Sequence, residues 1–93
     1  MKPTTGQRYL EVTFRRGRAM AAYLYLPRRA GDTVESSREL GDALVVDYSL
    51  DGRVIGLDIV DPAALGPEEI VRALRSLGVT DVTSEEFRPL AAA

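Results

Sequence analysis

The chain has 93 residues and a formal net charge of −2, with 28% of its residues charged and 45% hydrophobic. It contains no cysteine, histidine or tryptophan, which excludes disulfides, cysteine zinc sites, thiol nucleophiles, Ser-His-Asp triads and imidazole metal ligands. The length and apolar content predict one folded domain over residues 1–93. No apolar run has transmembrane length and the first residues do not resemble a signal peptide, so we expect a cytoplasmic protein without membrane contact.

The small net charge is the sum of two opposite parts. Seven basic side chains against Glu11 give +6 in residues 1–30, and five arginines against thirteen carboxylates give −8 in residues 31–93. Opposite charges on two parts of one chain favour complementary contacts between copies.

The first predicted element is a β-hairpin that follows a flexible tail over residues 1–7. Tyr9–Phe14 alternates apolar and polar residues, which is typical of a half-buried strand, with Leu10, Val12 and Phe14 on one side. Gly17 supplies the positive φ of a tight turn. The second strand, Ala19–Leu26, is apolar on both faces and ends at Pro27. One face carries Met20, Ala22, Leu24 and Leu26, and the other carries Ala19, Ala21, Tyr23 and Tyr25.

The next predicted elements are a polar edge strand at Thr33–Ser37 and a second hairpin. Ala43–Ser49 and Arg53–Val60 flank Asp51-Gly52, which is among the strongest short-range hairpin signals. A two-residue loop there pairs Leu44 with Ile59, Val46 with Leu57, and Tyr48 with Ile55 on one apolar face.

The last predicted elements are helical. Pro67–Leu77 has proline at its first position, acidic residues in its first turn and one apolar stripe, and Gly78 follows as the C′ residue. We expect a short strand at Val79–Val82, then one helical turn capped by Thr83 or Ser84, and a flexible tail over residues 89–93. The predicted fold is α+β: an antiparallel β-meander of four or five strands with one C-terminal helix packed on the sheet. A small curled barrel with the helix as a plug is the alternative.

Two segments resemble a known family. Residues 45–60, VVDYSLDGRVIGLDIV, and residues 22–26, AYLYL, are similar to strands of a family of very short prokaryotic proteins of unknown function, over about residues 20–62. The chain differs from that family's pattern at Met20, Ser49 and Asp58. Some members of the family are encoded beside small toxins, so the resemblance implies an antitoxin-like role as one alternative.

The carboxylates of the second hairpin are candidate metal ligands. Asp47 and Asp58 lie on the same predicted face, and hard cations such as Mg²⁺ and Ca²⁺ bind carboxylate oxygens. The competing interpretation is that both residues keep that face soluble while Asp51 forms the turn. The spacing does not match an EF-hand loop.

The first hairpin offers two candidate surfaces. Its basic tip, made by Arg15, Arg16 and Arg18, resembles a ribbon that enters a DNA groove, but the acidic remainder disfavours nucleic-acid binding. Its second strand has more apolar surface than one helix can cover, so we expect Met20, Tyr23 and Tyr25 at a homodimer interface. A monomer whose helix covers the sheet is the alternative.

No constellation of catalytic residues or phosphate-binding loop appears, so we expect a protein that is not an enzyme and has no cofactor. The sequence favours a small, self-associating protein–protein interaction module. An antitoxin-like protein that neutralises a small toxin and a carboxylate-based divalent-metal site are the alternatives.

Overall fold

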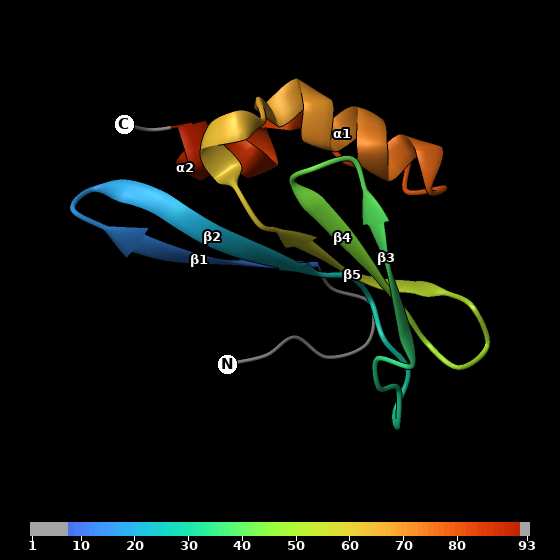
Figure 1. Cartoon of the computed structure of the whole chain (residues 1–93). Coiled ribbons are helices and arrows are strands. Elements are labelled where there is room, and N and C mark those ends of the chain that lie inside the picture. The colour runs from blue at the N-terminus through green and yellow to red at the C-terminus, as the bar shows by residue number, and fades with distance from the viewer. Residues whose placement is uncertain (1–7, 92–93) are drawn as a thin grey trace.

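The computed structural model describes residues 8–91, so the predicted tail over residues 1–7 and the last two residues of the predicted tail over 89–93 lie outside it. Five strands form one open antiparallel sheet in the order β1-β2-β5-β4-β3 (Figure 1). The strands are β1 (Tyr9–Arg15), β2 (Arg18–Tyr25), β3 (Ser36–Leu40), β4 (Leu44–Tyr48) and β5 (Val54–Ile59). The predicted α+β fold, with helices packed on an antiparallel sheet of five strands, is confirmed. The order is not that of a simple meander, because β5 lies between β2 and β4. The alternative of a small curled barrel is wrong because the sheet is open.

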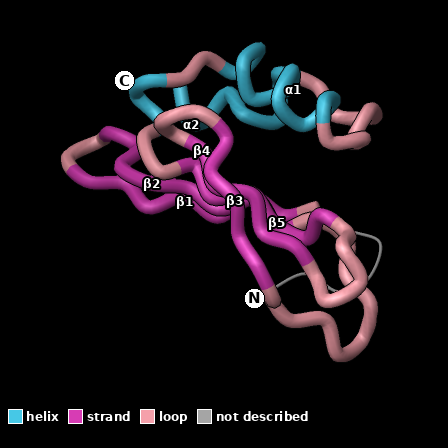
Figure 2. Tube along the Cα trace, turned by 45° about the vertical axis from the view of Figure 1, so that its right-hand side comes forward, coloured by secondary structure: helices cyan, strands magenta, loops and turns pink. Residues whose placement is uncertain are grey.

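The helices form a second layer on one face of the sheet (Figure 2). They are η1 (Pro62–Ala64), α1 (Pro67–Ser76), η2 (Ser84–Phe87) and α2 (Arg88–Ala91). The core lies between the layers, where Leu24, Val46 and Leu57 from the sheet meet Leu74 and Phe87 from the helices. Within residues 8–91, no helix combines the length and apolar character that a membrane crossing needs.

Helix α1 begins at the predicted residue and ends at Ser76, one residue before the predicted end. Pro67 occupies the first position, and the Glu69 carboxylate accepts a hydrogen bond of 3.0 Å from the backbone N–H of Gly66. This bond satisfies one of the donors left free at a helix start, where the helix dipole also favours a negative charge. The helix ends before Leu77, and Gly78 follows with a φ of +92° that favours glycine.

The β1–β2 turn is tight, but its hairpin is irregular. Arg16 and Gly17 both have positive φ, 54° and 77°, as a type I′ turn requires. Between the pairs Thr13–Ala21 and Phe14–Ala19, Met20 is an extra residue on β2. This bulge changes the alternation, so Ala19 packs against the core and Met20 is exposed. The predicted inclusion of Met20 in the apolar face of Leu24 is therefore wrong.

The second hairpin contains two irregularities that shift the strand register in opposite directions. The backbone N–H of Ser49 donates a 2.9 Å hydrogen bond to the carbonyl of Arg53 around three residues, not two, and Gly52 holds the positive φ of 85°. This loop pairs Tyr48 with Val54 and corrects the predicted pair of Tyr48 with Ile55. A bulge at Ile55 then shifts the register back, so the predicted pairs Leu44–Ile59 and Val46–Leu57 are confirmed.

Three other predicted elements differ from the structure. The edge strand occupies Ser36–Leu40 where the sequence predicted Thr33–Ser37. Val79–Val82 forms no strand, and Val82 instead fills the core as part of a loop. In place of a tail from residue 89, Arg88–Ala91 continues the η2 turn as a short helix because Leu90 is buried.

Candidate functional site

The sheet face away from the helices carries a polar network centred on Tyr23. From β2, the Tyr23 side chain extends across β5 and donates a 2.7 Å hydrogen bond to Oδ2 of Asp47 on β4. Gly56 lies beneath the ring, and a Cβ on residue 56 would overlap the Tyr23 hydroxyl. Glycine at this position therefore permits one side chain to connect three adjacent strands. Burial and the hydrogen bond to Asp47 raise the pKa of Tyr23 well above its usual value.

Arg28 connects this network to the end of β2. Its Nη2 donates to the Tyr23 hydroxyl at 3.3 Å and to the carbonyl of Ile55 at 3.0 Å. Ile55 is the bulged residue of β5, so Arg28 supplies a donor to a carbonyl at the irregular point of the ladder. The guanidinium also lies 5.2 Å from the centre of the Tyr25 ring, within the range of a cation–π contact.

Tyr25 is buried within a single chain, with 9% of its surface exposed. Its ring makes an edge contact of 4.7 Å between centroids with Tyr23 and a tilted contact of 6.1 Å with Tyr9. The sequence assigned Tyr23 and Tyr25 to an interface between copies. The structure places both in contacts inside one chain.

The candidate metal ligands Asp47 and Asp58 share this open face. Asp47 accepts hydrogen bonds on both oxygens, from Tyr23 and, at 2.6 Å, from the Ser37 hydroxyl. Asp58 pairs with Tyr23 across the strands, and burial, with a smaller contribution from the Asp47 charge, raises its pKa. Throughout residues 8–91, no three acidic residues gather closely enough to hold a metal ion. Each carboxylate oxygen of Asp47 is engaged by a hydroxyl group of the same chain, Oδ2 by Tyr23 and Oδ1 by Ser37.

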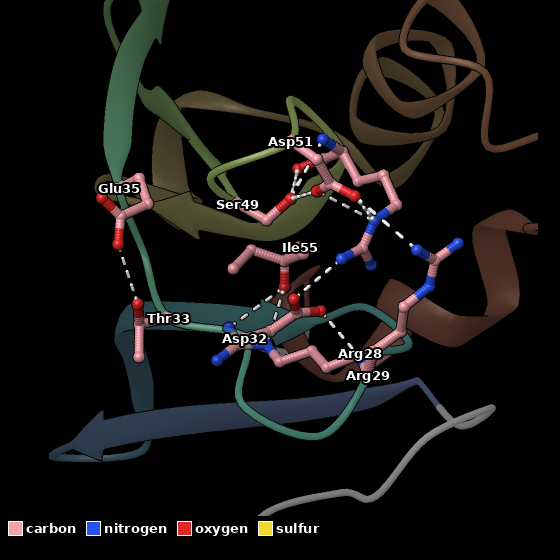
Figure 3. A network of polar contacts seen from close by, with 9 residues as sticks. Arg28, Arg29, Asp32, Thr33, Glu35, Ser49, Asp51 and Ile55 are labelled. Carbon is pink, nitrogen blue, oxygen red and sulfur yellow. Dashed lines mark hydrogen bonds and ion pairs between the residues drawn. The ribbon is translucent and has the colours of Figure 1, made fainter.

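A second network joins the loop after β2 to the turn between β4 and β5 (Figure 3). Arg53 contacts Asp32 at 2.7 Å and Asp51 at 3.0 Å, while the Ser49 hydroxyl donates to Asp51. The hydrogen bonds from Arg53 and then Ser49 lower the pKa of Asp51 to about 2. Arg29 lies 3.6 Å from Asp51 at the outer side. These charges neutralise one another, which indicates a structural connection between two loops.

A third group of charges connects the two ends of the described chain. Arg8 contacts Glu86 at 3.0 Å and Asp81 at 2.8 Å. The hydrogen bond to Glu86 is the main cause that raises the pKa of Arg8. The start of β1 is thereby held against the helical layer. No local sequence pattern predicts this group, because Arg8 is more than seventy positions away from Asp81 and Glu86.

The comparisons bear on the first network. Residues 20–61 match the family model described as a protein of unknown function, DUF2283. The matched segment contains Tyr23, Arg28, Asp47 and Gly56. Of the open-face network, it leaves out Tyr9 and Glu11, whose carboxylate accepts a 3.5 Å hydrogen bond from the Tyr25 hydroxyl. This agrees with the segment expected from the resemblance to a family of unknown function. Comparison with curated proteins and with solved structures found no match.

The β1–β2 hairpin extends beyond the DUF2283 segment and beyond the rest of the sheet (Figure 1). We call Thr13–Met20 the arm. Phe14 and Met20 expose 53% and 51% of their surfaces there, beside the exposed side chains of Arg15, Arg16 and Arg18. The predicted basic tip and the predicted interface residue Met20 therefore lie together on the arm. Sequence alternation predicted a half-buried Phe14, but the core does not reach that far along β1.

Proposed function

We propose that this chain is a small protein–protein interaction module that associates with a second copy of itself through the arm. The observation that carries the proposal is the pair of large apolar side chains, Phe14 and Met20, exposed at the end of a projecting hairpin. Clustered apolar side chains ringed by polar groups are typical of surfaces that other proteins cover. The proposed activity is binding, and it requires no catalytic group or cofactor.

The strand pairing of the arm supports the proposal. β2 pairs with β5 only from Ala22 to Tyr25, so residues 18–21 have β1 as their neighbour on one side and no neighbouring strand from the described chain on the other. An isolated two-stranded ribbon is marginally stable in water. Contact with another protein surface would bury the apolar side chains of the arm and stabilise its ladder.

The charge of the arm also favours a second copy of the same chain as its partner. Arg15, Arg16 and Arg18 are exposed on the arm, whereas residues 31–93 carry a formal charge of −8. A basic arm and an acidic body on each copy give two matching pairs of surfaces in a two-fold dimer. Raising the ionic strength should therefore weaken the association.

Light scattering on the full chain tests this function. We expect a mass near twice 10.2 kDa for the unmodified chain and a shift toward monomer in Phe14→Ser and Met20→Ser. Leu50→Ser is the matched control, because Leu50 is 84% exposed in the turn between β4 and β5, away from the arm. Equal masses for the unmodified chain and all three variants would contradict the proposal.

A further inference from the structure

We propose that β1 of one copy pairs antiparallel with β1 of a second copy around a two-fold axis at Thr13. This inference rests on the proposed self-association and names the surface that performs it. The result would be one continuous sheet across the dimer, with both helical layers on the same side.

The outer edge of β1 is available for pairing. Sheet order places β1 at one end, and no strand of residues 8–91 lies beyond it. β1 has seven residues, YLEVTFR, that are rich in aromatic and β-branched side chains. Such an edge exposes backbone N–H and C=O groups that another strand can satisfy.

The opposite edge is less suited to pairing. β3 has five residues, SSREL, and carries Arg38 and Glu39 at adjacent positions. Short strands with charged side chains are the usual protection of a sheet edge. The two edges therefore differ in length and side-chain chemistry, and β1 is the one that favours an added strand.

The sequence of β1 is complementary to itself in this register. A two-fold axis at Thr13 sets Glu11 opposite Arg15 of the second copy, Val12 opposite Phe14, and Thr13 opposite Thr13. Opposite charges, aromatic with β-branched residues, and threonine pairs are all stabilising across antiparallel strands. The exposed Phe14 ring of each copy would then be covered by Val12 of the other copy.

The same pairing brings opposite charges together beyond the ladder. Antiparallel pairing carries the turn at Arg16 and Gly17 to the start of the second copy's β1. There Arg8 already binds Asp81 and Glu86, which leaves one negative charge in excess. The Asp81 side chain is 78% exposed, so it is accessible to an arginine from the other copy. This charge complementarity identifies a second copy of the chain as the occupant of the edge.

A charge exchange tests the register. Glu11→Arg and Arg15→Glu each place like charges opposite one another at both pairs, and we expect each to weaken dimerisation about tenfold or more. The double variant restores opposite charges, so its dissociation constant should return close to that of the unmodified chain. Sedimentation equilibrium measures all four proteins. Failure of the double variant to recover, with both single variants weakened, would overturn the register.

Cysteine crosslinking tests the edge directly, because the chain contains no cysteine of its own. Thr13→Cys should form a disulfide-linked dimer on mild oxidation, whereas Arg38→Cys in the middle of β3 should remain monomeric on a denaturing gel. A dimer in solution that crosslinks through residue 38 or through neither position would overturn the β1 edge and leave self-association intact. A monomer at all concentrations would overturn both proposals.

Discussion

The hydroxyl of Tyr23 crosses above Gly56 to donate a hydrogen bond to Asp47, so a single side chain joins β2, β5 and β4. This relationship depends on the absence of a side chain at residue 56 as much as on the phenol. It explains how a small sheet without disulfides or histidines keeps its open face ordered.

Gly56→Ala should destabilise the fold by about 1–3 kcal/mol, the usual range for overpacking. The added methyl group would overlap the Tyr23 ring and hydroxyl. Urea denaturation measures the change in the free energy of unfolding. In a Tyr23→Ala background the same substitution should cost much less, since the overlapping atoms are gone. Equal costs in both backgrounds would show that the ring does not contact Gly56.

Tyr23→Phe should lower the free energy of unfolding by about 1.5–3 kcal/mol, the range for a hydrogen bond to a charged group. It should also change the ultraviolet titration of the four tyrosines. In the unmodified chain, Tyr23 should ionise well above the usual pKa of about 10, because burial and Asp47 oppose its charge. Persistence of that late ionisation in Tyr23→Phe would assign it to another residue.

Asp58→Asn should stabilise the chain at neutral pH. Burial and the neighbouring Asp47 raise the pKa of Asp58, so its charged form is less favourable in the folded protein than in the unfolded chain. The penalty is absent below the unfolded pKa of about 3.9 and develops as pH rises through the higher folded value. The melting temperatures of the two proteins should therefore differ at pH 7 and converge near pH 3. A destabilised variant at pH 7 would contradict this account.

Asp51 should titrate with a midpoint of about 2 in a carboxyl carbon NMR experiment. Its lowered pKa means that its ion pairs stabilise the folded chain above the unfolded pKa of about 3.9 and are lost as pH falls toward 2. Arg53→Gln removes the first cause of the shift, so the midpoint should rise toward its usual value. An ordinary midpoint in the unmodified chain would show that Arg53 does not bind Asp51 in solution.

The elements that sequence analysis predicted well are those whose pattern is local. Pro67, Gly78 and the apolar stripe between them define α1, and Asp51-Gly52 between apolar runs defines the second hairpin. The core pairs Leu44–Ile59 and Val46–Leu57 are confirmed, although the prediction assumed a two-residue loop and a regular ladder. A three-residue loop and the bulge at Ile55 each shift the register by one residue, in opposite directions.

The parts that sequence analysis missed depend on contacts between distant positions. Met20 is exposed because of a bulge opposite Thr13 and Phe14, which no alternation pattern reveals. Val79–Val82 has the composition of a strand, but it pairs with no strand of the described chain and buries only Val82 fully, as part of a loop. The partners of Tyr23 and Asp47 required the order of the strands, because β5 lies between them.

Amide hydrogen exchange at several protein concentrations tests the central proposal, self-association through the β1 edge, most directly. We expect exchange in residues 11–15 to slow as concentration rises, while exchange in β3 stays constant. The Arg15→Glu variant should show no such dependence at the same concentrations. Exchange in β1 that is independent of concentration, or slowing confined to β3, would contradict the account.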